Sequence, residues 1–276
     1  MFTGVPGERA RSALAQGPGS RFVDVRWVAE TGSTNADAMA LARDGEPEGI
    51  VVVADHQTAG RGRRGRSWEA PPGAGLLASI LLRPPAAVVD ACTMAVAVAA
   101  AEAVEGVAGF SPRLKWPNDL VWPGDGSAPD RKLAGILAEA DWPVEGVVVG
   151  IGVVVGIGIN VAWPEELPAE LAEIAVACNH VTGVEVDRED LLVALLRRLD
   201  ARYGPLVATG DTTSLRAAWR ARSATLGRQV RVDLGADELV GTAVDVTADG
   251  HLVVETAGGE RRTIAAGDVV HLRPAI

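Results

Sequence analysis

The chain has 276 residues, of which 48% are hydrophobic and 22% charged. This length suits one large domain or a large and a small one, and the composition excludes a largely disordered protein. The net charge of −10 argues against nucleic acid as the main partner, because phosphate binding needs a concentrated cationic surface. Cys92 and Cys178 lie far apart without metal-type spacing, so a reducing cytoplasm is expected rather than a disulfide framework or a zinc site.

The first predicted element is an N-terminal arm, residues 1–20, which lacks the apolar core of a signal peptide and is too short for a helix-turn-helix module. Residues 21–223 are expected to form the main domain, in which no stretch predicts a membrane-spanning helix. The mixture of elements predicts an α+β fold with a mixed or antiparallel sheet. Strands are expected at residues 21–29, 50–55, 76–82, 113–121, 132–140 and 147–161, and helices at 36–43, 90–104, 188–203 and 214–222.

The pattern changes near Ala224. From Gly227 onward, short candidate strands alternate with glycine-containing turns, which is typical of a small antiparallel barrel. Residues 224–276 are therefore predicted to form a second domain, close to the smallest size that folds without disulfides or metals.

A tandem duplication marks the last strand of the main domain. Residues 147–152 read Val-Val-Val-Gly-Ile-Gly and are repeated without change at 153–158. Because six is an even number, an extra copy leaves the facing of later strand residues unchanged. The second copy, continuous with Asn160, is expected to occupy the functional register, as part of a hairpin with the strand at 132–140.

Residues 60–66 form a loop rich in glycine and arginine. It matches the letters of a dinucleotide-binding G-x-G-x-x-G motif, but a proline-containing turn and a strand follow instead of the required helix. Its arginines carry forked donors that match phosphate oxygens. The sequence therefore predicts a flexible loop that orders around a phosphate, with a solvated or nucleic-acid-contacting basic loop as the alternative.

Lysine is almost absent, since Lys115 and Lys132 are the only two among 26 basic residues. A compact ammonium approaches a phosphate or carboxylate where a guanidinium does not fit, so these two lysines are candidates for chemistry. Strand periodicity places Lys115 and Asp119 on one face, where Asp119 could hold a metal or orient the lysine; an Asx-type turn with a surface salt bridge is the alternative. Lys132 opens a strand whose Gly135 implies close approach of a ligand or another backbone.

Taken together, these motifs resemble those of the biotin protein ligases and occur in that family's order. The resemblance rests on Gly32–Asn35, Gln57–Trp68, Lys115–Asp119, Arg131–Ile136 and Gly156–Val161, and it spans the chain from about residue 22 to its end. It implies a class II synthetase-like catalytic domain followed by an SH3-like domain. It also implies that biotin and MgATP give biotinoyl-5′-AMP, from which a lysine of a biotin carboxyl carrier domain, for example of acetyl-CoA carboxylase, takes the biotin. An arginine loop, Lys132 and Mg²⁺ would offset the repulsion between the reacting anions.

The resemblance further implies roles for single residues. Biotin contacts are expected from Ser33, Thr34, Asn35, Gln57, Arg61, Gly62, Arg63, Trp68, Lys132 and Gly135. ATP and adenylate contacts are expected from Arg61, Arg63, Arg64, Arg66, Trp68, Lys115, Asn118, Lys132 and Asn160. The catalytic residues are expected to be Lys132, Arg63, Lys115 and Asp119, with Asp119 as the Mg²⁺ ligand.

Two other functions compete with this one. A lipoate or octanoate ligase shares the architecture, but the full loop together with Gln57 and Trp68 favours biotin. A nucleic-acid-binding module is disfavoured by the many acidic residues of the barrel segment. The sequence therefore predicts a monofunctional ligase that is a monomer or weak homodimer and binds neither DNA nor membranes.

Overall fold

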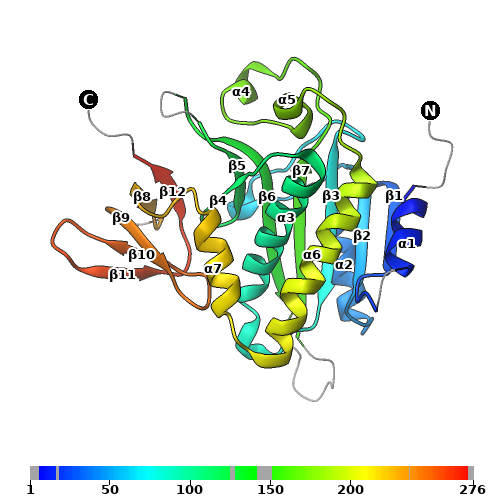
Figure 1. The fold of residues 1–276 in the computed structure, drawn as a ribbon, viewed down its shortest axis with the longest axis horizontal. Coiled ribbons are helices and arrows are strands. Elements are labelled where there is room, and N and C mark those ends of the chain that lie inside the picture. Colours follow the sequence, from blue (N-terminus) through cyan, green and yellow to red (C-terminus); the bar gives the residue numbers. More distant parts are fainter. Residues whose placement is uncertain (1–5, 17–18, 125–127, 142–150, 236, 273–276) are drawn as a thin grey trace.

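The computed structural model describes residues 6–16, 19–124, 128–141, 151–235 and 237–272. The main domain is built on seven strands: β1 (Asp24–Thr31), β2 (Ile50–Gln57), β3 (Gly75–Leu82), β4 (Arg113–Lys115), β5 (Asp119–Trp122), β6 (Arg131–Asp141) and β7 (Gly152–Asn160). They form one sheet in the order β1-β2-β3-β7-β6-β5-β4 (Figure 1). β1 and β2 run parallel and the other neighbours antiparallel, so the predicted mixed sheet is confirmed.

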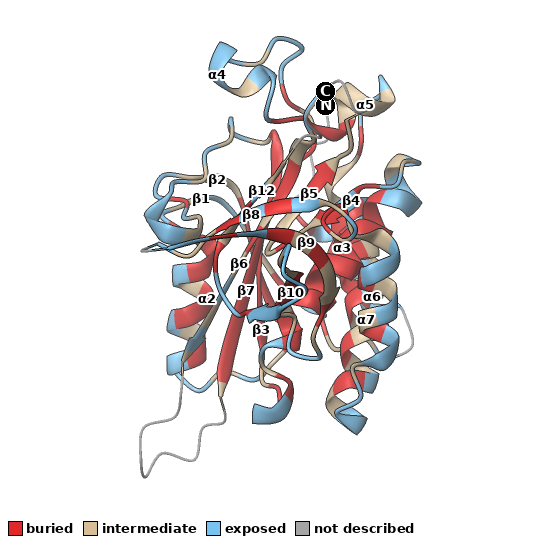
Figure 2. Ribbon diagram, turned by 90° about the vertical axis from the view of Figure 1, so that its left-hand side faces the viewer, coloured by how far each residue is buried: buried red, intermediate tan, exposed pale blue. Residues whose placement is uncertain are grey.

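Helices cover both faces of this sheet. α2 (Thr34–Arg43) lies on one face, while α3 (Ala91–Ala108), α6 (Arg188–Thr209) and α7 (Thr213–Arg222) lie on the other (Figure 2). Among the described residues, α3 is the helix long and apolar enough to cross a membrane by composition, but 67% of it is buried inside the fold. Its alanine-rich sequence therefore serves close packing against the sheet and α6.

The centre of the sheet explains why β3 and β7 are continuous apolar runs. Every residue of both strands is buried, because helices cover the two faces. β7 pairs with β6 as the predicted hairpin, and it contains the second hexapeptide copy, Val153–Gly158. Most of the first copy, residues 147–150, lies outside the described residues.

The N-terminal segment differs from its prediction as an arm. Residues Glu8–Ala15 form helix α1, and Ala10 and Leu14 are fully buried. Arg9 pairs with Asp187 at 2.6 Å, and the Ala10 backbone N–H donates to a Glu189 carboxylate oxygen at 2.8 Å. Contacts with the start of α6 therefore stabilise this helix. The short apolar pattern of the segment did not predict these contacts.

The segment at 113–121, predicted as one strand, also differs from its prediction. It forms two strands, β4 and β5, joined by a tight turn at residues 116–118. Lys115 and Asp119 are direct cross-strand partners. They share a face as predicted, but through antiparallel pairing rather than through the alternation of a single strand.

The C-terminal domain is a five-stranded antiparallel sheet. Its strands are β8 (Gln229–Asp233), β9 (Glu238–Val246), β10 (Leu252–Glu255), β11 (Arg261–Ile264) and β12 (Asp268–His271), in the order β11-β10-β9-β8-β12. A partly buried polar contact joins it to the main domain: the Asp130 carboxylate accepts from Arg228 at 2.8 Å and lies 3.1 Å from His271 Nδ1. Two short helices, α4 (Ala169–Ala172) and α5 (Cys178–Thr182), were not predicted.

Candidate active site

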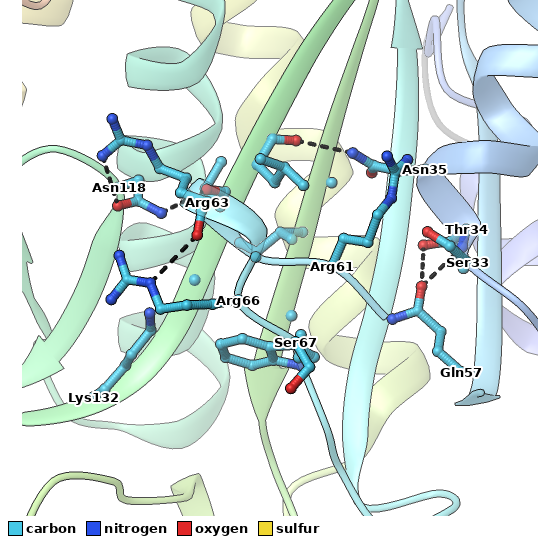
Figure 3. A pocket seen from close by; sticks show the side chains of 18 residues that line it. Ser33, Thr34, Asn35, Gln57, Arg61, Arg63, Arg66, Ser67, Asn118 and Lys132 are labelled. Atoms are coloured by element: carbon cyan, nitrogen blue, oxygen red, sulfur yellow. Dashed lines mark hydrogen bonds between the residues drawn. The ribbon is translucent and has the colours of Figure 1, made fainter. Parts of the chain in front are cut away.

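A cavity lies where the start of α2, the end of β2 and the loop at 60–68 meet the middle of β6 and β7 (Figure 3). Its volume is about 110 Å³, which is below the roughly 300–1,000 Å³ of most small-molecule sites. The fold therefore brings residues of all five sequence motifs together around one small space. The lining residues are Ser33, Thr34, Asn35, Gln57, Arg61, Gly62, Arg63, Arg66, Ser67, Trp68, Asn118, Lys132, Gly135, Ile136, Leu137, Gly156, Ile157 and Gly158.

One end of the cavity is polar and rigid. Gln57 Oε1 accepts hydrogen bonds from the Thr34 backbone N–H at 2.8 Å and from Thr34 Oγ1 at 3.0 Å. Ser33, Thr34 and Asn35 are at most 6% exposed. Thr34 binds the side-chain oxygen of Gln57, and the Nε2 hydrogens of Gln57 remain available to a ligand.

The floor of the cavity is covered by Trp68. Gly135 of β6 and Gly158 of β7 are cross-strand partners, and the indole lies against both. A Cβ at Gly135 would lie 2.8 Å from ring carbon Cζ3, and a Cβ at Gly158 would lie 2.5 Å from Nε1. The close approach predicted at Gly135 was of a ligand or another backbone, whereas the neighbour in the structure is the Trp68 side chain. Indole Nε1 is buried without a hydrogen-bond partner, which costs about 1–3 kcal/mol until an acceptor arrives.

Lys132 lies at the opposite end from Gln57 (Figure 3). Its Nζ is 2.7 Å from Asp119 Oδ1 and 5.4 Å from the centre of the Trp68 ring. Asp119 Oδ1 is buried and has no hydrogen-bond partner, so the contact with Lys132 is an ion pair without hydrogen-bond geometry. The ammonium is therefore held at the cavity by a carboxylate and an aromatic face.

The backbone of Lys132 is anchored as well. Its N–H donates to Ile174 O at 2.7 Å, and its carbonyl accepts from the Val176 N–H at 2.9 Å. Asn160 is buried and donates through Nδ2 to the carbonyls of Lys132, at 3.4 Å, and Val176, at 3.1 Å. Asn160 thus fixes the start of β6 in this structure.

The arginine loop is folded rather than extended. It contains a 3₁₀ turn, η1 (Arg63–Gly65), and closes through a 2.6 Å hydrogen bond from the Gly62 N–H to Arg66 O. Arg63 is partly buried, and this burial lowers the pKa of its guanidinium. Its Nη1 lies 3.5 Å from Asn118 Oδ1.

The loop also contacts the C-terminal domain. Arg64 Nη1 is 2.9 Å from Asp233, and Arg66 Nη2 is 2.9 Å from Asp268. The hydrogen bond to Asp233 raises the pKa of Arg64 and, after that of the Gly235 N–H, lowers the pKa of Asp233. Ion pairs thus connect this loop to both domains, and its ordering around a phosphate stays a prediction.

The structure separates the predicted site residues into two groups. Those that line the cavity are Ser33, Thr34, Asn35, Gln57, Arg61, Gly62, Arg63, Arg66, Trp68, Asn118, Lys132 and Gly135. Arg64 turns toward the C-terminal domain, and Asp119 and Asn160 act on Lys132 from outside the lining. Lys115 lies on the edge strand β4 and is also outside it.

Sequence reasoning missed two polar residues, Ser79 and Glu139. Ser79 is fully buried on β3, and its hydroxyl hydrogen can be donated to Thr34 Oγ1 at 2.7 Å or to Asn35 Oδ1 at 2.6 Å. Glu139 on β6 accepts from Asn35 Nδ2 at 2.8 Å. A serine inside the apolar run of β3 was the one available signal, because a buried hydroxyl needs a partner.

Comparison with known proteins decides the family. Residues 31–160 match the biotin/lipoate A/B protein ligase family, and residues 225–272 match the biotin protein ligase C-terminal domain. The chain is 38% identical over 268 residues to the biotin–[acetyl-CoA-carboxylase] ligase of Mycobacterium tuberculosis, covering 94% of this chain and 92% of that protein. The chain belongs to the biotin protein ligase family.

Other members are similar over most of the chain. The bifunctional ligase/repressor of Bacillus subtilis is 33% identical over 240 residues, which is 85% of this chain and 70% of that protein. The structure of the biotin protein ligase from Aquifex aeolicus in complex with biotin and ATP superposes with a TM-score of 0.75 and 27% identity, over 91% of this chain and 100% of that one. The predicted catalytic domain and SH3-like C-terminal domain of a biotin protein ligase are confirmed, and the comparisons favour biotin over the lipoate and nucleic-acid alternatives.

Proposed function

We propose that this biotin protein ligase binds biotin lengthwise in the cavity and carries out both steps of protein biotinylation there. In the first step a biotin carboxylate oxygen attacks the α-phosphorus of ATP, and the bond to pyrophosphate breaks. In the second step a lysine amine of the carrier attacks the acyl carbon, and AMP leaves. One observation carries this proposal: neutral polar groups at Ser33, Thr34 and Gln57 lie at one end, and the cations Lys132 and Arg63 lie at the other (Figure 3).

The charge distribution suits adenylation. A carboxylate and a triphosphate repel each other, so positive charge is needed where they meet. Lys132 would contact both the biotin carboxylate and the α-phosphate, while Arg61 and Arg63 would close over the adenylate. Burial strengthens the interaction of Arg63 with an incoming anion, because less water screens the charge.

The cavity must open before both substrates enter. Trp68 covers the glycine floor, and residues of the arginine loop line the cavity beside it. Arg64–Asp233 and Arg66–Asp268 are exposed ion pairs that water screens, so they contribute little and the loop can be displaced at low cost. We infer that Trp68 and the loop move aside together and then pack on the adenylate.

Asp119 fits the role of Mg²⁺ ligand as a single carboxylate. Its buried Oδ1 has no hydrogen-bond partner and faces Lys132. No cluster of three or more acidic, histidine or cysteine side chains suited to a metal occurs within the described part of the chain. This agrees with a Mg²⁺ that arrives on ATP, since protein sites for this ion commonly offer one or two carboxylates and leave the rest to phosphates and water. Bound there, Mg²⁺ would neutralise charge on the triphosphate.

Several features of the wider function extend this proposal. The acceptor would be a biotin carboxyl carrier domain, and the enzyme would act in the cytoplasm, where its two buried, free cysteines stay reduced. Burial raises the pKa of each thiol to about 12, so neither is a nucleophile for this reaction. We expect residues 21–223 to act as the catalytic domain and 224–276 as its partner domain, in a monomer or weak homodimer.

Pyrophosphate release with MgATP tests the function directly. Biotin, lipoate and octanoate are offered separately to the same preparation, and release is expected with biotin. A second assay adds a biotin carboxyl carrier domain and detects the biotinylated lysine by mass spectrometry. Release that is faster with lipoate or octanoate than with biotin would contradict the proposal.

A further inference from the structure

Glu139 connects two parts of the site that come from different elements. A single oxygen, Oε2, accepts a hydrogen bond from Asn35 Nδ2 at 2.8 Å and from Arg61 Nη2 at 3.0 Å. Asn35 belongs to the helix at the polar end of the cavity, and Arg61 begins the arginine loop. Glu139 itself lies on β6, beyond the strand residues that line the cavity, and its side chain is 30% exposed.

The Asn35 amide is held so completely that it has little left for a ligand. Its Nδ2 hydrogens are donated to Leu137 O at 3.2 Å and to Glu139, and its Oδ1 lies 2.6 Å from Ser79 Oγ. A Cβ at Gly156 would lie 2.0 Å from Oδ1, so the amide also fills the space over that glycine. Because an amide has two donor hydrogens, both are already used. Asn35 therefore contributes to the site mainly through its hydrogen bonds to Glu139, Leu137 and Ser79.

Arg61 occupies the other side of Glu139. It is 49% exposed, and it forms an isolated bridge with Ser67 that closes the base of the loop. Farther along the loop, Arg64 and Arg66 are attached to the C-terminal domain. Among the ion pairs formed by the described residues, the one between Arg61 and Glu139 thus attaches the base of this loop to the sheet of the catalytic domain.

We propose that Glu139 is a positioning residue that holds the base of the arginine loop against the biotin end of the cavity. The proposal rests on the proposed function of this cavity. A glutamate suits the position because its oxygen accepts from two donors at once and charge-assisted bonds are about twice as strong as neutral ones. A glutamine keeps one carbonyl oxygen that can accept from both donors, but it lacks the negative charge that strengthens the bond to Arg61. Loss of the carboxylate charge should therefore weaken the attachment of Arg61, and with it the hold on the base of the loop.

The test compares Glu139→Gln with Asp141→Asn. Asp141 lies two residues along the same strand and pairs with an arginine, Arg43, at 3.6 Å, but it does not line the cavity. Glu139→Gln is expected to raise the KM for biotin about tenfold, because the charge-assisted bond to Arg61 becomes a weaker one, with a smaller change in the KM for ATP. Hydrogen exchange at residues 61–67 in the unliganded protein should become faster. Asp141→Asn should change neither quantity.

Two further results separate this proposal from its alternatives. If Glu139 acts through Arg61, then Arg61→Gln should raise the KM for biotin similarly, and the double variant should be no worse than either single one. Equal hydrogen exchange and equal KM values in Glu139→Gln and Asp141→Asn would overturn the positioning role. If wild-type protein releases no pyrophosphate with biotin, the proposed function fails, whereas the exchange measurement still decides whether Glu139 holds the loop. If the Glu139→Gln protein does not fold, Glu139→Asp replaces it. Its shorter side chain is expected to speed hydrogen exchange of the loop in the same way, but to a smaller extent.

Discussion

The indole of Trp68 rests directly on Gly158, where a Cβ would lie only 2.5 Å from the indole nitrogen. A side chain at position 158 and the observed position of Trp68 exclude each other, so this glycine keeps the floor of the site flat. The same holds for its cross-strand partner Gly135, where a Cβ would lie 2.8 Å from a carbon of the ring. The two glycines thus make room for the Trp68 ring, and neither is needed for a turn.

We expect Gly158→Ala to displace Trp68 and to raise the KM for biotin by more than about tenfold, while overpacking lowers the free energy of unfolding by about 1–3 kcal/mol. Pyrophosphate release and urea denaturation measure the two effects. Gly204→Ala is the control, since nothing lies within 4 Å of a Cβ there and alanine favours the helix. An unchanged KM in Gly158→Ala would show that Trp68 does not wall the biotin site.

Lys132→Arg keeps the charge but should lower the rate of adenylation by about 100-fold or more, because a planar guanidinium cannot occupy the place of a compact ammonium between Asp119 and Trp68. Single-turnover formation of biotinoyl-5′-AMP is the measurement, and thermal unfolding checks that the fold is intact. Near-normal turnover would remove Lys132 from its catalytic role.

Asp268 lies within 4.0 Å of three loop arginines, Arg63, Arg64 and Arg66. We expect Asp268→Asn to speed hydrogen exchange of the loop and to change the KM for ATP by about two- to fivefold, the size expected for exposed ion pairs. Both effects should shrink at high salt, which screens the wild-type pairs. Glu260→Gln, an exposed change in the same domain, serves as the comparison; identical behaviour of the two variants would mean that the domain does not hold the loop.

Deletion of residues 147–152 should leave activity and stability close to those of the full chain. Gly146 then precedes Val153, so the complete β7 sequence from glycine to Asn160 is retained. Residues 142–145 remain as a connection of four residues to β6, a length that suits a hairpin. Biotin-dependent pyrophosphate release and the midpoint of urea denaturation are the readouts. A loss of folding would show that the first copy is needed.

Stability should fall on acidification because of His271. Burial, followed by the charges of Lys115 and Arg228, lowers the pKa of His271 to about 4, although the neighbouring Asp130 carboxylate acts in the opposite direction. The unfolded chain, with a histidine pKa of about 6.5, therefore takes up the proton first. The contribution of this group is fully present above pH 6.5 and is lost between about pH 6.5 and 4, on the order of 2 kcal/mol. Urea titrations across this range should show the loss, and His271→Gln should reduce it; an equal slope in both proteins would exclude His271 as its source.

The sequence by itself determined those features of the protein that depend on the pattern of neighbouring residues. Apolar runs located β3 and β7, alanine content located α3, and the order of five motifs identified the family. These features are short in sequence, and each follows from periodicity or from residue types that one chemistry requires. The positions of Lys132 and of the arginine loop within the site were predicted in the same way.

Only the tertiary structure decided what each polar side chain touches. Helix α1 depends on its contact with Asp187 and Glu189, more than 170 residues away in sequence. Asn35, Glu139 and Arg61 meet because α2, β6 and the loop converge, and Trp68 finds its place because two glycines face each other across β6 and β7. Local pattern fixes the facing of a residue along its own element, whereas pairing, crossing and packing between elements place it beside a distant partner.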